Sequence, residues 1–282
     1  MKRSRLLLVL LCVLLFLLFA WFIWFVLQSK PKSPGKIAPY YDNSVFTRNP
    51  SLGSPSPAGK AVKLPIIMYH YVEYRKSFGD LIEKRLDINP DIFEKQLITL
   101  KQAGYNSYFV KDVPNIIEKK KTVPLKSLVL SFDDGYEDFY STIFPILKKY
   151  NFKATLFVSY NYVGRKGFVT FPQMAEMIAS GRVEIGSHTI DHLFLTAVPR
   201  SIARTQIFNS KNLLEKKLGV PIKTFAYPYG AFDKTLAKMV QEAGYKAAVS
   251  VINGDLQSEE NLYYLSRISA QTFIRQNILI LL

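Results

Sequence analysis

Two adjacent carboxylates stand directly after an apolar run near the middle of the chain. The run at 127–130 leads into the segment Ser131–Gly135, which contains Asp133 and Asp134. A short apolar run closed by a glycine is typical of a buried strand of a parallel sheet, and the carboxyl ends of such strands are where α/β folds place catalytic groups. The alternative is a strand that ends in an ordinary Asp-Gly turn. The segment alone does not choose between a site and a turn.

The chain contains three histidines, His70, His188 and His192, and all of them come after predicted strands. Because His188 and His192 are four residues apart, a helical turn would direct both imidazoles toward one metal ion. An isolated pair at this spacing is about as often two unrelated histidines, and the glutamate of the zinc-peptidase motif is missing.

Adding the carboxylate of Asp134 to these two histidines changes that balance. Two imidazoles and one carboxylate leave positions open for water and a substrate oxygen, as in a catalytic zinc site, and cobalt or nickel accept the same ligands. Asp133 would then be free to take a proton from the water that attacks a carbonyl carbon. Backbone N–H groups around Tyr229, in the turn 227–230, would stabilise the developing oxyanion, unless this segment is only a Pro-Gly turn.

These residues need a scaffold that brings several strand ends together, and the sequence predicts one. Strand and helix patterns alternate at least seven times after residue 63, which gives either a distorted (β/α) barrel or an open doubly wound sheet. The barrel is favoured because the candidate residues follow separate strands. The predicted strands are 64–70, 106–110, 127–130, 153–158, 183–187, 223–227, 246–251 and 262–270, and the predicted helices are 89–104, 113–121, 138–150, 171–181, 199–218 and 233–244.

Composition narrows the setting of this domain. The chain has 282 residues, of which 49% are hydrophobic, and lysine plus arginine exceed aspartate plus glutamate by 15. This charge suits an anionic neighbourhood such as a membrane surface, an anionic wall polymer or nucleic acid. Nucleic acid is the least favoured partner because the basic residues are scattered and the chain carries an apolar segment. Cys12 is the only cysteine, which excludes a disulfide framework and a cysteine metal site.

An uncharged apolar stretch at 6–27 predicts a transmembrane anchor. It lacks the small-residue cleavage site of a signal peptide, so an uncleaved anchor is expected, and the preceding basic residues favour a cytoplasmic N-terminus with the catalytic domain extracytoplasmic. The predicted location is therefore the cell membrane, with a single pass. The predicted organisation is a basic segment at 1–5, the anchor at 6–27, a flexible linker at 28–62 and the catalytic domain at 63–282.

Three motifs in this order resemble the polysaccharide deacetylases, carbohydrate esterase family 4, over the interval 65–270. They are Phe-Asp-Asp-Gly at 132–135, His-Thr-Ile-Asp-His at 188–192 and Pro-Tyr-Gly at 228–230. The resemblance implies a distorted (β/α) barrel, a divalent metal, usually zinc, and hydrolysis of N-acetyl groups on amino-sugar polymers or O-acetyl groups on xylan.

The resemblance also assigns roles to individual residues. It makes Asp133 the base and Asp134, His188 and His192 the metal ligands. The remaining motif would line the oxyanion site and the substrate groove, through Pro228, Tyr229 and Gly230.

Two positions depart from the pattern of the family. Ala226 stands where many members carry an arginine that orients the catalytic aspartate, and Arg267 stands where many carry a late histidine as general acid. We hypothesise that His70 takes the acid role and that Arg267 replaces the missing guanidinium. For His70 the alternative is a hydrogen-bonded histidine at a strand end.

The sequence therefore predicts a membrane-anchored, metal-dependent hydrolase that removes N-acetyl groups from a cell-surface polysaccharide. Peptidoglycan, poly-N-acetylglucosamine and chitin-like polymers all present the same acetamide, so the polymer stays open at this point, as does the oligomeric state. The alternative is a catalytically impaired carbohydrate-binding or scaffold protein on the same fold.

Overall fold

A computed structural model describes residues 61–74, 81–118, 124 and 126–276. The chain divides into two units, Met1–Tyr40 and Tyr41–Leu282, and all of the described residues belong to the second unit. The predicted basic segment, the predicted anchor and the predicted linker up to residue 60 lie outside the described residues. The predicted domain boundaries therefore stay predictions.

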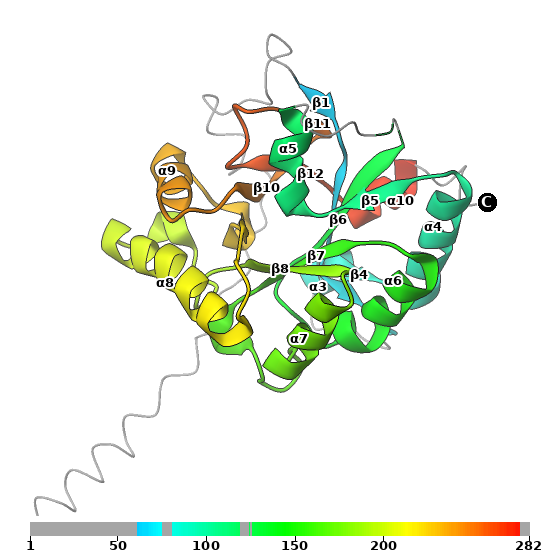
Figure 1. The fold of residues 1–282 in the computed structure, drawn as a ribbon, viewed down its shortest axis with the longest axis horizontal. Coiled ribbons are helices and arrows are strands. Elements are labelled where there is room, and N and C mark those ends of the chain that lie inside the picture. The colour runs from blue at the N-terminus through cyan, green and yellow to red at the C-terminus, as the bar shows by residue number, and fades with distance from the viewer. Residues whose placement is uncertain (1–60, 75–80, 119–123, 125, 277–282) are drawn as a thin grey trace, which may run out of the picture. The chain divides into compact units, whose positions relative to one another are not determined.

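Within the described residues, seven parallel strands close into a ring, which confirms a distorted barrel rather than an open sheet (Figure 1). The additional pairing of β2 with β6 closes the ring. An eighth strand, β5 (Asn106–Tyr108), pairs with the first half of β6 and distorts the barrel there. The order around the ring is β2 (Ile66–Tyr69), β12 (Leu265–Ser269), β10 (Ala247–Asn253), β9 (Thr224–Ala226), β8 (Val183–Ser187), β7 (Ala154–Val158) and β6 (Ser127–Phe132).

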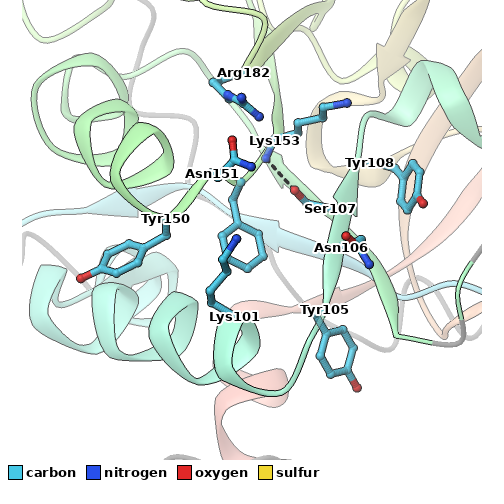
Figure 2. Close-up of a pocket in the computed structure, with 10 residues that line it drawn as sticks. Lys101, Tyr105, Asn106, Ser107, Tyr108, Tyr150, Asn151, Lys153 and Arg182 are labelled. Carbon is cyan, nitrogen blue, oxygen red and sulfur yellow. Dashed lines mark hydrogen bonds between the residues drawn. The ribbon is translucent and has the colours of Figure 1, made fainter.

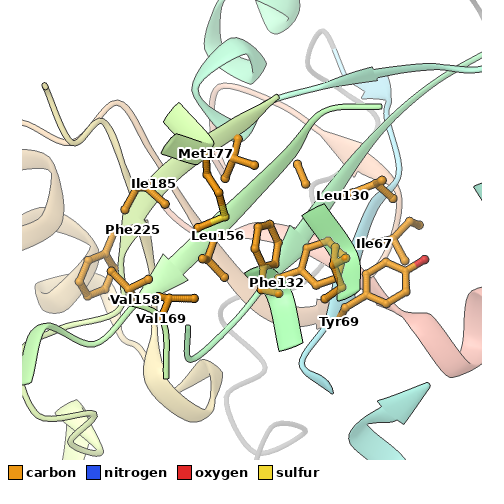
Figure 3. Close-up of a cluster of buried hydrophobic side chains, with 14 of the residues drawn as sticks. Ile67, Tyr69, Leu130, Phe132, Leu156, Val158, Val169, Met177, Ile185 and Phe225 are labelled. Carbon is orange, nitrogen blue, oxygen red and sulfur yellow. The ribbon is translucent and has the colours of Figure 1, made fainter. Parts of the chain in front are cut away.

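Side chains of the barrel strands alternate between two hydrophobic clusters. Leu130 belongs to the larger cluster, which lies between the strands and the surrounding helices, and Figure 3 shows it with Leu156 and Ile185 of the neighbouring strands. Val129, one residue earlier, belongs to the second cluster, inside the ring, as the two-residue period of a strand requires. Asp133 has the same parity as Val129, so its side chain is directed to the inside of the barrel at the rim.

The helices that pack outside the barrel begin and end at recognisable signals. The side chain of Asn89 caps α4 (Pro90–Gln102), and Thr170 forms a capping box with Gln173 at the start of α7 (Phe171–Ala179). Gly219, with φ 68°, ends α8 (Arg200–Leu218) in the left-handed conformation. The other described helices are α3 (Leu81–Leu86), α5 (Val113–Ile117), α6 (Phe144–Tyr150), α9 (Lys234–Glu242) and α10 (Ala270–Gln276).

Some local elements differ from the prediction. The predicted helix 138–150 begins with a π-helical turn, Phe139–Ile143, before α6. Two small two-stranded sheets were not predicted, because strands of two residues are too short to show a period. They pair β1 (Val62–Lys63) with β11 (Leu256–Gln257), and β3 (Tyr71–Val72) with β4 (Asp87–Ile88).

The predicted single-pass location in the cell membrane, with the catalytic domain extracytoplasmic, is corrected. Among the described residues there is no helix whose length and apolar character would let it cross a bilayer. The longest helix given above, α8, has 19 residues and carries basic and acidic side chains along its length, which suit contact with water. The apolar stretch 6–27, from which the membrane location was predicted, lies outside the described residues.

Candidate active site

The candidate residues lie at one rim of the barrel. His70 directly follows β2, the pair Asp133 and Asp134 follows β6, and His188 follows β8. The turn Pro228–Gly230 follows β9. Because these strands are parallel, their carboxyl ends share one face, which is where barrel enzymes assemble catalytic groups.

Asp134, His188 and His192 form a cluster that fits a divalent metal ion. One ligand atom from each residue can be chosen so that all lie within 4.8 Å of one another. Asp134 Oδ1 is 3.3 Å from His188 Nε2 and 3.1 Å from His192 Nε2. The carbonyl oxygen of Ala226 lies 2.8 Å from His188 Nδ1, so that nitrogen carries the proton and Nε2 faces the cluster as an acceptor. Two imidazole nitrogens and one carboxylate are a donor set that zinc, cobalt and nickel accept.

The two histidines converge from a loop, which corrects the predicted helical turn. Residues 188–194 form neither helix nor strand. Thr189 and His192 have positive φ values of 72° and 55°, and the Thr189 hydroxyl accepts a hydrogen bond from the His192 N–H at 3.0 Å. A single left-handed residue redirects the chain more sharply than a helix does. This geometry, rather than a four-residue helical period, brings the imidazoles together.

Gln206 of α8 holds this loop, and the sequence did not identify it as part of the site. Its side-chain oxygen accepts hydrogen bonds from the N–H groups of Ile190 and Asp191, and its nitrogen donates to Asp191 Oδ2 at 2.6 Å. Asn161 donates to the other oxygen of Asp191 at 2.6 Å. The one feature that could have indicated this role is a polar side chain on the face of α8 that otherwise packs against the core, because a buried glutamine needs hydrogen-bond partners.

Asp133 is held by Arg267, whose side chain points from β12 into the barrel. The guanidinium donates to both carboxylate oxygens of Asp133, each at 2.8 Å. It also donates to the Ser250 carbonyl at 2.6 Å and to the Ser131 hydroxyl at 3.3 Å. Both side chains are buried: 0% of the Arg267 side chain and 4% of the Asp133 side chain are exposed to solvent. The aspartate is therefore fixed in one orientation by a planar, two-point contact.

His70 lies beside the same carboxylate. Its Nε2 is 3.9 Å from Asp133 Oδ2, which is near but beyond direct hydrogen-bond distance. Burial lowers the pKa of His70 below its usual value, although the charges of Asp133 and Asp134 oppose this. The structure thus brings His70 close to the carboxylate of Asp133, the candidate base.

Opposing charges keep the two carboxylates ionised despite their burial. Burial by itself would raise the pKa of Asp133, but the Arg267 guanidinium outweighs this and the pKa lies below its usual value. Burial also opposes ionisation of Asp134, but its interactions with His192 and His188 hold its pKa well below the usual value. Both groups are anionic at neutral pH, as a general base and a metal ligand must be.

The Pro228–Gly230 turn packs against the metal-ligand cluster. The Tyr229 ring lies 4.6 Å from the His192 ring, centroid to centroid. Tyr229 has a φ of 59° and Gly230 one of 66°, and a Cβ at position 230 would lie 2.3 Å from Val251 Cγ2. Only glycine therefore fits there without a shift of the β10 side chain.

Backbone strain is concentrated at this rim. Of the five described residues other than glycine that have positive φ, four belong to the site: Asp134, Thr189, His192 and Tyr229. Such conformations cost on the order of 1–3 kcal/mol each and persist where the surrounding structure enforces them, which is common at functional sites.

Comparisons with known proteins agree with this geometry. A family model described as polysaccharide deacetylase matches residues 120–248. The putative polysaccharide deacetylase YxkH of Bacillus subtilis is 31% identical over 209 residues, which cover 74% of this chain and 72% of that protein. The poly-beta-1,6-N-acetyl-D-glucosamine N-deacetylase of Staphylococcus aureus is 29% identical over 198 residues, covering 66% of this chain and 68% of that protein.

Solved structures give the same picture. The Streptococcus pyogenes deacetylase PplD in complex with acetate superposes with a TM-score of 0.67 at 32% identity, over 74% of this chain and 92% of that one. A putative polysaccharide deacetylase of Bacillus anthracis superposes with a TM-score of 0.66 at 25% identity, over 74% of this chain and 65% of that one.

Proposed function

Because this chain belongs to the polysaccharide deacetylase family and is thus a hydrolase, we propose that it removes N-acetyl groups from an amino-sugar polysaccharide of the cell surface. The proposal includes a divalent metal held by Asp134, His188 and His192, most simply Zn²⁺, with Co²⁺ or Ni²⁺ accepting the same ligands.

One observation carries the proposal: two neighbouring carboxylates have entirely different partners. Asp134 faces two imidazole nitrogens, while Asp133 faces a guanidinium that occupies both of its oxygens. A metal ligand and a general base need these different surroundings. The adjacent positions let both act on the same water molecule.

The chain's own residues then divide the reaction among them. Asp133 takes a proton from the attacking water as its oxygen bonds to the acetamide carbon. A backbone N–H of the Pro228–Gly230 turn stabilises the negative charge that develops on the carbonyl oxygen. Because burial lowers its pKa, His70 is neutral at rest, so it first accepts the proton that Asp133 took from the water. It then donates this proton to the leaving nitrogen as the carbon–nitrogen bond breaks, which yields acetate and a free amine. The bound metal would polarise the carbonyl group and acidify the water.

Arg267 acts as a positioning residue in this scheme. It fixes the carboxylate plane of Asp133 and keeps it ionised, and it does so from the strand position that replaces the family's late histidine. The Arg267 guanidinium takes the place of the arginine that many family members carry at the position of Ala226.

Among polymers, β-1,6-linked poly-N-acetylglucosamine is our first candidate substrate. The Staphylococcus aureus relatives that act on this polymer by name are 29% identical over 198 residues. Chitin-like oligomers and peptidoglycan present the same acetamide and belong in the same test.

The experiment measures acetate release by the full chain loaded with Zn²⁺, Co²⁺ or Ni²⁺ in turn. The substrates are a β-1,6-linked N-acetylglucosamine pentamer, a chitin pentamer and peptidoglycan fragments. We expect acetate from the β-1,6 pentamer at the highest rate. Metal-loaded protein that releases no acetate from any of them would contradict the proposed function.

The role of His70 is tested separately with His70→Ala. We expect a fall in kcat of about 10²–10⁴-fold with unchanged metal content, since that is the usual contribution of a general acid. Near-normal kcat would remove His70 from the mechanism.

A further inference from the structure

A cavity of about 490 Å³ lies next to the ends of β2 and β6. Tyr71 and Tyr136 line it, and these residues come directly after His70 and two positions after Asp134. The cavity therefore adjoins the strand ends that carry the candidate site residues. Its volume falls within the range of small-ligand pockets and suits about one sugar ring.

Aromatic side chains build one wall of this cavity. The rings of Tyr71 and Tyr136 stack with centroids 4.0 Å apart, and Phe168 lies 5.2 Å from Tyr136. A β-bridge between Tyr136 and Phe168 fixes this arrangement, and the Glu137 N–H donates to the Gly167 carbonyl at 3.0 Å. The wall is thus held by backbone pairing. Aromatic faces of this kind offer a flat apolar surface to the ring of a sugar.

The polar residues of the cavity are acidic or neutral. Glu73, Glu137 and Asp138 line it together with Ser141 and Thr142, and none of the described residues that line it is a lysine, arginine or histidine. This is unexpected in a chain whose lysine and arginine residues exceed its acidic residues by 15.

A second cavity shows that the acidity is local. It measures about 300 Å³, lies near the start of β7 and β8, and is lined by Lys101, Lys153 and Arg182 with no carboxylate (Figure 2). The catalytic residues follow the opposite ends of the strands. Among the described residues, these two cavities are thus lined by charged side chains of opposite sign.

We propose that the acidic cavity binds the sugar unit next to the one being deacetylated, and that it favours a unit whose amine is already free. This inference rests on the proposed function. A free amine on an amino sugar is protonated and positively charged near neutral pH, whereas the acetamide is neutral. The carboxylates of Glu73 and Glu137 attract the charged amine but not the neutral acetamide. The aromatic wall contacts the sugar ring in both cases.

This preference affects both the pattern of the product and the choice of polymer. Each deacetylated unit binds the cavity better than an acetylated one and so favours reaction at the unit beside it, and free amines accumulate in runs along the polymer. A polysaccharide whose neighbouring sugars carry carboxylates is repelled by the same cavity. The chemistry therefore selects a homopolymer of amino sugars.

The test compares two β-1,6-linked N-acetylglucosamine pentamers, one fully acetylated and one with a free amine on its central ring. We expect the full chain, loaded with Zn²⁺, to have a kcat/KM about two- to fivefold higher for the second pentamer, in the range of one ion pair at a partly exposed site. Mass spectrometry should place the new amines next to the existing one. Raised ionic strength should reduce the preference, because salt screens the attraction.

Two substitutions locate the preference in the cavity. Glu73→Gln and Glu137→Gln should each move the ratio of the two kcat/KM values toward one. The matched control is Glu259→Gln, the same change at an exposed position outside the cavity, which should leave the ratio as in the wild type. Phe168→Leu should lower kcat/KM for both pentamers by the same factor, since stacking does not sense the charge of the amine.

The outcomes separate the two proposals. Acetate released from both pentamers at equal rates, with new amines scattered, would overturn the cavity proposal and leave the proposed function standing. Absence of acetate from either pentamer would overturn the proposed function and this inference with it. A preference that persists in both Glu73→Gln and Glu137→Gln would exclude the cavity as its source.

Discussion

Replacing Arg267 by lysine tests whether Asp133 needs the two-point contact with the guanidinium to act as a base, or only a nearby positive charge. Arg267 donates to both oxygens of Asp133 and to the Ser250 carbonyl at 2.6–2.8 Å. A lysine keeps the positive charge but has one nitrogen, on a shorter reach, in place of a planar fork. It can satisfy one of these acceptors well and leaves the others without a donor inside the barrel.

The expected loss follows from the contacts that disappear. A hydrogen bond to a charged, buried group contributes about 1.5–3 kcal/mol, and two of the three short bonds are lost. Relaxation of the lysine recovers part of this, so we expect unfolding to become easier by about 3 kcal/mol. Removing one partner of a buried pair entirely costs about 3–5 kcal/mol, which sets the upper limit. Misorientation of the base should lower kcat by up to about 10²-fold with little change in KM.

The assay combines urea unfolding with acetate release under matched metal loading. Arg204→Lys is the control, because Arg204 also meets a carboxylate, that of Glu242 at 2.9 Å, but both side chains are about half exposed. An exposed pair contributes under about 1 kcal/mol, and we expect wild-type kcat from this variant. Equal stability losses in the two variants, or full activity in Arg267→Lys, would refute the reasoning.

Three further predictions concern the metal ligands, the tight turn and a buried acid. Asp134→Asn should lose bound metal on dialysis, whereas Asp133→Asn should keep its metal and lose turnover; equal metal loss in both, measured by elemental analysis, would contradict the division of roles. Gly230→Ala should destabilise the fold by about 2–4 kcal/mol in urea unfolding, because left-handed strain adds to the clash with Val251. Gly219→Ala should cost only about 1 kcal/mol, because φ is 68° there but nothing lies within 4 Å of the new Cβ. Similar losses in the two variants would exclude the clash. Burial raises the pKa of Glu184 above its ordinary 4.5, although Thr155 and Thr224 donate hydrogen bonds to it. Its folded form therefore holds a proton more tightly, so stability that is complete below the unfolded-chain pKa is lost as pH rises through the folded pKa. The urea midpoint of wild type should fall relative to Glu184→Gln across that window, and a pH-independent difference would contradict this.

The fold was predictable because its signals are long and redundant. The strands β6 and β7 are buried along their whole length and consist mainly of apolar residues, and α7 begins at a capping box. Closure of the ring depends on the β2–β6 pairing, between residues more than sixty positions apart, and no local pattern specifies it. The barrel was chosen instead from the positions of the polar residues at strand ends.

The candidate site was predictable in its residues but not in its geometry. The sequence offered Arg267 because it stands in place of an expected histidine, but its contact with Asp133 follows from how β12 and β6 face each other across the barrel. The loop that carries His188 and His192 was wrongly given a helical turn, since nothing in the residue types of Thr189 and His192 signals a left-handed backbone. Gln206 was missed because its partners, the backbone of Ile190 and both the backbone and the side chain of Asp191, lie 15 and 16 positions earlier, beyond the reach of a local pattern.

The partnership of Asp133 with Arg267 also orders events during the making of the protein. These residues are 134 positions apart, and β12 is the last strand of the ring along the chain. While the chain emerges from the ribosome, every other strand of the barrel is complete before this arginine is available. The base therefore gains its orienting partner only when β12 docks between β2 and β10. A chain that stops before β12 lacks the partner that orients Asp133, and we expect it to be inactive.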